Sequence, residues 1–402
     1  MNSELARRIA FTLGALLIYR IGSHILLPGI NPAVWDQFFH SASGGVLGMV
    51  SALSGGAVAR LSILSLGIVP FVSAAILVQV AILFAPRLRA LRDSGEDGRR
   101  RIDRYTLALT VLVAATQSYG IARGLQQVTH LVPDPGALFI LITVLTLIAG
   151  ALVVVWLCNQ ITARGIGNGI ALILCVGFVT SLPGNVFGTL ELGRQGHFSM
   201  GFIAGLGLFS AALIALVVRF EKARRLEPVA FASGADVRTA FLSFKLNGAG
   251  VIPTVIASWV IAVLLLLASY FGAEDFTSKL APGQPVFMLT YAIVVFFSVY
   301  LYTAFVLDPN EAAEKLQRYG GTIAQVQPGE ATSEHLDRVL SHVTLVGAVY
   351  FVAVCLIPEL LLSWAQVPFY FGGTALLVLV CTVLDIEKQA REFALVPGFR
   401  SS

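Results

Sequence analysis

Charged residues are scarce in this chain of 402 residues, where Asp, Glu, Lys and Arg together account for only 12%. A soluble domain uses about 25% charged residues to cover its surface, so water is not the solvent around most of this chain. Hydrophobic residues account for 56% and gather in blocks of about 20, the length of helix that spans the hydrocarbon core of a bilayer. The alternation of polar and apolar residues expected of a transmembrane β-barrel is absent. The composition therefore predicts a membrane protein made of helices.

Residues that hold metals or carry out catalysis are equally few. The four cysteines lie in or beside apolar blocks without a CxxC pair, which is typical of small buried side chains rather than of disulfides or metal ligands. The six histidines show no HExxH spacing, and no GxxxxGKS or GxxxxGKT loop is present to hold a nucleotide phosphate. We therefore expect a protein that is not an enzyme and that has no catalytic residue, metal or cofactor.

Ten apolar blocks are long enough to cross a membrane as helices. Of the 27 basic residues, 22 lie before the first block, after the last one or in alternate connecting segments. Because cytoplasmic segments carry the excess of Lys and Arg, both termini are expected in the cytoplasm, which agrees with an even number of spans. The expected spans are residues 9–27, 61–84, 105–124, 137–158, 169–183, 201–218, 249–270, 286–307, 339–357 and 367–384.

Acidic residues are missing from all ten expected spans. Proton-coupled carriers place a carboxylate within the membrane because that group binds and releases the proton. The absence argues against such a carrier, but a small-solute secondary transporter with an inverted-repeat fold remains the alternative function. The polar groups that remain in or at the spans include the amides of Gln79, Gln117 and Asn247, and such side chains commonly bond to a neighbouring helix.

Two short motifs recur along the chain in the same order. Gly67–Ala74 at the second span matches Gly250–Ala257 at the seventh, and Gly169 and Gly373 open similar stretches at the fifth and tenth spans. Both pairs are five spans apart, and an odd number of spans in each half places the halves in opposite orientations. The repeats therefore predict two inverted halves with a central site between them.

Seven stretches are more specific than the composition. They are Leu27–Pro32, Leu53–Ala57, Leu66–Pro70, Gly95–Ile102, Arg164–Ile170, Asn247–Pro253 and Val367–Thr374. Together and in this order they resemble the SecY family, and the resemblance covers nearly the whole chain. It implies an all-α polytopic membrane protein with ten transmembrane helices in two inverted, pseudo-symmetric five-helix halves. It also implies the central protein-conducting channel subunit of a translocase, which passes unfolded secretory proteins across the membrane and releases membrane-protein segments sideways into it.

The resemblance also implies a division of the chain into segments. A short plug helix would block the external side of the pore at rest. The implied segments are an N-terminal half at 1–183 with spans 1–5 and the plug at about 40–60, an external loop and span 6 at 184–218, a cytoplasmic docking loop at 219–248, and the rest of the C-terminal half at 249–402 with spans 7–10 and a cytoplasmic loop at 308–338.

Three groups of residues take roles from the resemblance. An aliphatic ring would surround the pore, because apolar walls hold no particular substrate and a narrow apolar constriction resists ion leakage. Polar residues would latch the lateral gate weakly, and basic loops would dock partners, although topology and anionic lipid also favour such loops. The pore ring comprises Ile68, Val72, Ile170, Leu174, Val255 and Val378; the gate residues are Gln79, Gln117 and Asn247; the docking residues are Arg99, Arg100, Arg101, Arg224, Arg225, Lys315, Arg318 and Gln327.

The partners implied by the resemblance are small membrane subunits similar to SecE and SecG, the SecA motor ATPase or the ribosome, unfolded preproteins and membrane lipid. The implied location is the bacterial cytoplasmic (inner) membrane. Two docking positions depart from the family pattern, because Gln327 stands where an arginine is usual and Leu226–Phe231 replaces the usual stretch. These departures put coupling to the motor or ribosome in doubt, and they leave open a housekeeping SecY or a specialised second copy.

Overall fold

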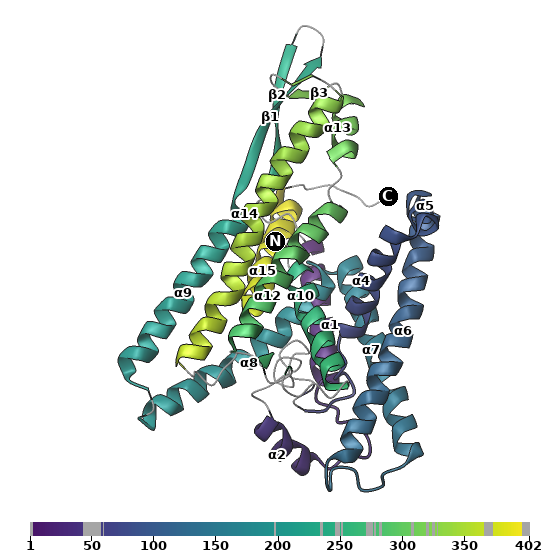
Figure 1. Ribbon diagram of the computed structural model, residues 1–402, viewed down its shortest axis with the longest axis vertical. Coiled ribbons are helices and arrows are strands. Elements are labelled where there is room, and N and C mark those ends of the chain that lie inside the picture. Colours follow the sequence, from purple (N-terminus) through teal and green to yellow (C-terminus); the bar gives the residue numbers. More distant parts are fainter. Residues whose placement is uncertain are drawn as a thin grey trace. The chain divides into compact units, whose positions relative to one another are not determined.

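The structure of this chain is a computed structural model, shown in Figure 1. It forms two compact units, one made of Met1–Val186 with Thr382–Ser402 and the other of Phe187–Cys381. Both boundaries between the units fall within long helices. The structure describes residues 3–395 except 43–57, 59, 197, 234–235, 246–249, 251, 271–275, 277–278, 281–283, 307–308, 319–320, 324–325, 328 and 366–372.

Long helices make up most of the described residues of both units. The helices from the N-terminus onward are α1 (Ser3–Gly22), α2 (Pro32–Ala42), α4 (Val69–Phe84), α5 (Pro86–Asp93), α6 (Glu96–Gln127), α7 (Ala137–Arg164) and α8 (Gly169–Arg194). The remaining elements are α9 (Met200–Lys222), β1 (Arg224–Ser233), β2 (Asp236–Lys245), α10 (Ile252–Tyr270), α12 (Pro285–Val306), α13 (Pro309–Arg318), β3 (Gly321–Ile323), α14 (Glu330–Ala365) and α15 (Gly373–Leu395).

A stripe of small residues on α6 explains how the first unit packs. Thr106, Thr110, Ala114, Ser118 and Ala122 are spaced one turn apart and are buried where α6 meets its neighbours α4 and α7. Small side chains let helix backbones approach closely, which matters because lipid gives apolar helices little reason to associate. The hydroxyl groups of the stripe donate to carbonyls one turn earlier, so the contact buries them with partners.

A hydrophobic core holds the connecting segments of the first unit against α6 and α7. Trp35 of α2, Leu131 and Leu147 are buried in it. Residues 25–27 run antiparallel to residues 61–63, because the Leu27 amide donates to the Leu61 carbonyl at 3.0 Å and the Ile63 amide donates to the Ile25 carbonyl at 2.9 Å. The segment before α4 is thereby attached to the end of α1.

The second unit combines a helical bundle with a small sheet, seen at the top of Figure 1. In the bundle, α12 packs against both α10 and α14. In the sheet, β1 lies between β2 and β3 and is antiparallel to both, with Arg224 opposite Lys245. Val229 of β1, Ile323 of β3 and Leu336 of α14 are buried together in a core of their own. The sheet therefore joins two connecting segments that are distant in sequence.

Ten of the described helices overlap the ten expected spans, with ends that differ by up to eleven residues: α1, α4, α6, α7, α8, α9, α10, α12, α14 and α15. By length and hydropathy, six of the described helices can cross a membrane, and a seventh can if α4 and α5, which bend by 109° at their junction, form one span. Strands in the segment 219–248 were not expected, since that segment was interpreted as a loop. The segment 308–338 likewise contains α13, β3 and the start of α14.

Several helices are longer than their apolar blocks. At the third expected span, α6 begins at Glu96 rather than at 105. At the fifth, α8 ends at Arg194 rather than at 183, and at the ninth, α14 covers Glu330–Ala365 rather than 339–357. Hydropathy identifies only the apolar part of a helix, whereas the backbone hydrogen bonds of the helix continue into polar sequence. In α6 the added first turn carries two acidic residues, which the positive end of the helix dipole favours.

Candidate functional site

Four of the proposed ring residues begin two helices of the first unit. Ile68 is the N-cap residue of α4, and Val72 follows one turn later. Ile170 and Leu174 are also one turn apart, at the start of α8. Residues four apart share one face of a helix, so each pair presents one aliphatic surface. Ile68 and Leu174 are buried, while Val72 and Ile170 are half-buried.

The other two ring residues begin helices of the second unit. Val255 is the fourth residue of α10 and is half-buried, and Val378 is the sixth residue of α15 and is buried. All six ring positions therefore fall at the starts of helices, in the first two turns or, for Ile68, at the cap. The contacts that hold these helix starts in place therefore also bear on the proposed ring.

The two glycines of the sequence repeat make equivalent contacts in the two units. A side-chain carbon on Gly169 would overlap the carbonyl of Cys158 and come within 2.8 Å of its Cα, on the preceding helix α7. A side-chain carbon on Gly373 would overlap the Val354 carbonyl and come within 2.5 Å of the Cα of Cys355, on the preceding helix α14. In each unit a glycine thus lets the helix that carries ring residues start directly against the backbone of the helix before it.

Hydrogen bonds secure both helix starts. The Gly169 amide donates to Thr162 Oγ1 at 2.9 Å, and Asn168 Oδ1 accepts from the amide of Ile170 at 2.9 Å as an N-cap. In the second unit the hydroxyls of Tyr291 and Thr374 are 2.7 Å apart, which ties α12 to the first turn of α15. Tyr291 is fully buried, and a buried hydroxyl needs a hydrogen-bond partner, which Thr374 provides.

Glu359 is a buried acidic residue two positions beyond the expected end of the ninth span. The helix α14 continues past the expected end at 357, and Glu359 is 1% exposed within it. It follows Cys355 by one turn, on the face that meets Gly373. The expected apolar block ends two residues before Glu359, so hydropathy alone does not predict that this side chain is buried.

The two proposed gate residues that the structure describes lie on neighbouring helices. Gln79 is exposed on α4, and Gln117 is half-buried on α6, which packs against α4. The Oε1 atom of Gln117 is buried and accepts no hydrogen bond from the described residues. Asn247 lies outside the described residues. A polar latch between these helices stays a prediction.

The docking residues of the first unit extend from the first turns of α6. Arg99, Arg100 and Arg101 are all exposed, and Arg100 forms an ion pair of 2.8 Å with Glu96 on the same helix. Such an exposed pair contributes at most about 1 kcal/mol to stability. These arginines are therefore available to a partner.

The docking residues of the second unit are grouped around its sheet. Arg224 is exposed on β1, and Arg225 follows it. Lys315 and Arg318 are exposed on α13, which packs against β3 and α14. The exposed Gln327 lies between β3 and α14. Its backbone carbonyl accepts a hydrogen bond from Thr332 Oγ1 at 2.8 Å, which ties this position to the first turn of α14.

The proposed plug segment is described only at its ends. Residues 43–57 and 59 lie outside the described residues. Burial lowers the pKa of the Arg60 guanidinium at the end of the segment, and the charge of nearby Arg20 lowers it further.

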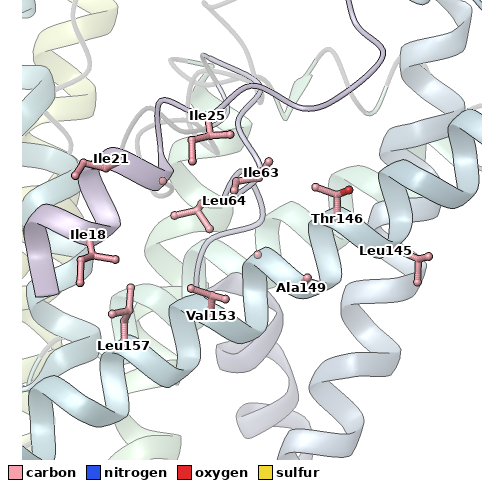
Figure 2. A pocket seen from close by; sticks show the side chains of 12 residues that line it. Ile18, Ile21, Ile25, Ile63, Leu64, Leu145, Thr146, Ala149, Val153 and Leu157 are labelled. Carbon is pink, nitrogen blue, oxygen red and sulfur yellow. The ribbon is translucent and has the colours of Figure 1, made fainter.

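A groove of about 580 Å³ lies on the first unit between α1, residues 63–64 and α7 (Figure 2). Gly22 and Gly150 allow residues 63–64 to approach the two helices, since a side-chain carbon on either glycine would meet Leu64 or the Ile63 carbonyl. Its walls are aliphatic, with Thr146 as the polar exception, and Ile18 and Ile21 are more than half exposed. No group of three or more possible metal ligands occurs in the described part of the chain.

Comparison with known proteins identifies the family of this chain. The sequence profile of the SecY family matches residues 62–387. The chain belongs to the SecY family. It is 38% identical to the protein translocase subunit SecY of Escherichia coli strain K12, over 99% of this chain and 94% of that protein, and 39% identical to that of Pseudomonas aeruginosa, over 97% and 91%.

Solved structures confirm the fold of this SecY-family chain. It resembles a protein-conducting channel with a TM-score of 0.70 at 18% identity, over 98% of this chain and 94% of that one. It also resembles Sec61 in a canine ribosome–channel complex, with a TM-score of 0.67 at 17% identity, over 98% and 94%. The predicted SecY resemblance and helical polytopic fold are therefore confirmed, with the sheet of β1, β2 and β3 as an addition outside the helices.

Proposed function

We infer that this chain is the protein-conducting channel subunit of a Sec translocase, a transport protein rather than an enzyme. The match along nearly the whole chain to SecY translocase subunits carries the inference. The placement of all six ring residues at the starts of their helices supports an aliphatic constriction. An apolar ring suits a channel that must pass chains of any sequence and still resist ion flow.

Crosslinking to a stalled substrate tests this function. The native cysteines are first replaced, and Cys is then introduced at Ile68, Val72 or Val255 in the assembled translocase. We expect disulfide or photo-crosslinks to a preprotein arrested in transit at these sites, and none at Phe84, which is exposed at the end of α4. A transiting chain that avoids all three ring positions would contradict the proposal.

The same proposal covers the orientation and the segments of the chain. The protein is a multi-pass membrane protein of a family with bacterial members, and we place it in the bacterial cytoplasmic (inner) membrane with both termini in the cytoplasm, because the basic residues favour that orientation. The segment at about 40–60 acts as the plug, and spans 2, 3 and 7 form the lateral gate, with Asn247 at the start of the seventh span.

Cytoplasmic partners are proposed to dock on the two exposed basic groups. The comparison structures include a Sec61 channel and an Ssh1 complex bound to ribosomes, and for this chain we propose a ribosome or the SecA motor. Arg99–Arg101 and the sheet with α13 present exposed cations that suit an acidic or phosphate-rich surface. The neutral Gln327 weakens one such contact, because an amide cannot replace the charge of an arginine.

One small membrane subunit is proposed to pack its helix into the groove of Figure 2. With Cys at Ile21 or Val153, we expect a crosslink to a SecE- or SecG-like subunit in the assembled complex. Cys at Leu208, an exposed position on α9, serves as the control. Labelling of the groove positions by lipid-soluble reagents at the same rate with and without the small subunits would instead assign the groove to lipid.

A further inference from the structure

The end of α15 makes a directed hydrogen-bond chain to a distant turn. Gln389 Nε2 donates to Asp385 Oδ2 at 3.3 Å, and Gln389 Oε1 accepts from the Gly167 amide at 2.8 Å. A carboxylate can only accept and a backbone amide can only donate, so the chemistry of its two neighbours fixes which way the Gln389 amide faces. Asp385 therefore orients Gln389 toward the turn.

Side chains of α1 and α15 hydrogen-bond three residues of the turn at 165–168. Its glycine at 167 has φ +84°, a backbone conformation that favours glycine. Arg8 Nη1 donates to the Gly165 carbonyl at 3.3 Å, and the Ile166 amide donates to Thr12 Oγ1 at 2.9 Å. Asn168 caps α8, and among the described residues the Gly167 amide is the donor of the turn that depends on α15.

A second contact joins the same end of α15 to the turn indirectly. The Arg8 guanidinium lies over the ring of Phe393, 4.7 Å from its centroid, while it binds the Gly165 carbonyl. Ile386 also packs near the turn, since a side-chain carbon on Gly167 would come within 3.2 Å of it. Thus the last turns of α15 fix the turn from one side and α1 fixes it from the other.

We propose that Gln389, oriented by Asp385, is a positioning residue that fixes the turn at 165–168 and thereby the first turns of α8 in the closed channel. Ile170 and Leu174, which the proposed function places in the pore ring, begin two residues after this turn. The inference rests on that proposed function for its effect on the channel, but not for its effect on the turn. Loss of the bond would let the start of α8 shift and loosen the constriction.

The test compares Gln389→Leu, Gln389→Glu and the double variant D385N/Q389E in the assembled translocase. Gln389→Leu removes the acceptor, and Gln389→Glu keeps it but places two carboxylates side by side. The double variant exchanges the amide and the carboxylate, so Asn at 385 can donate to Glu at 389, which still accepts from Gly167. Lys388→Ala is the matched control, because among the described residues Lys388 forms an exposed pair of 3.7 Å with Glu392 and does not contact the turn.

Two readouts separate the parts of the inference. We expect Gln389→Leu to speed hydrogen exchange of the amides at 166–172 about tenfold, the loss of roughly one hydrogen bond, and to raise resting ion conductance. The double variant should restore both relative to Gln389→Glu, and Lys388→Ala should change neither. Unchanged exchange in Gln389→Leu, or no rescue by the double variant, would overturn the positioning role.

Faster exchange with unchanged conductance would leave Gln389 as a support of the turn but would refute its role in channel closure. A normal crosslink from the ring to a transiting chain in the same samples shows whether the proposed channel function itself has failed. If Gln389→Leu does not accumulate, the comparison of Gln389→Glu with the double variant decides, because those two proteins differ only by one isosteric change at 385.

Discussion

Replacing Gly169 or Gly373 with alanine is expected to destabilise the protein by about 1–3 kcal/mol or more, because the added carbon would overlap a backbone carbonyl that cannot swing aside. The helix that carries ring residues would have to move away from its neighbour. Thermal unfolding of the purified protein in detergent measures the effect, together with the amount that accumulates in the membrane.

Each of these variants has a matched control. Gly184 lies on α8 and Gly205 lies on α9, and a side-chain carbon on either would meet nothing within 4 Å. Gly184→Ala and Gly205→Ala should be neutral or slightly stabilising, since alanine favours helix over glycine by up to about 1 kcal/mol. Equal melting temperatures for Gly169→Ala and Gly184→Ala would show that the close contact is not required.

Asparagine in the pore ring is expected to raise the resting ion conductance severalfold. An apolar constriction excludes water, and an amide that holds water there removes the barrier to ions. Leu174→Asn and Val378→Asn test the ring in the two units, with Val179→Asn and Val383→Asn as controls at exposed positions on the same helices. Conductance that rises equally in ring and control variants would refute the assignment of the ring.

The ten helices that overlap the expected spans could be predicted from the sequence, because each contains much of an apolar block of about the length that a membrane requires. The same signal failed at helix ends such as Glu96 and Glu330, where the backbone hydrogen bonds continue but the hydropathy falls. The strands of the segment 219–248 were missed, because a short sheet among charged residues gives a weak signal beside membrane helices. Burial of Val229 depends on residues nearly a hundred positions away, which no local pattern contains.

The candidate site was predictable to a similar extent. The repeat that contains Gly169 and Gly373 could be recognised in the sequence. The structure explains both glycines, because each lies in close contact with the backbone of the preceding helix. The bond between Gln389 and Gly167 spans 222 positions and could not be found without the fold. The family resemblance supplied the roles of the ring residues, and the structure adds that they occupy helix starts.

The helix α14 has a mechanical consequence within the second unit. It covers 36 residues, about 54 Å at 1.5 Å per residue, with Pro358 inside it near its C-terminal end. Near one end Leu336 is embedded in the core of the sheet, and towards the other Val354 and Cys355 form the seat of Gly373. The core of the sheet and the start of α15 are therefore attached to one helix, so a tilt of α14 would move both.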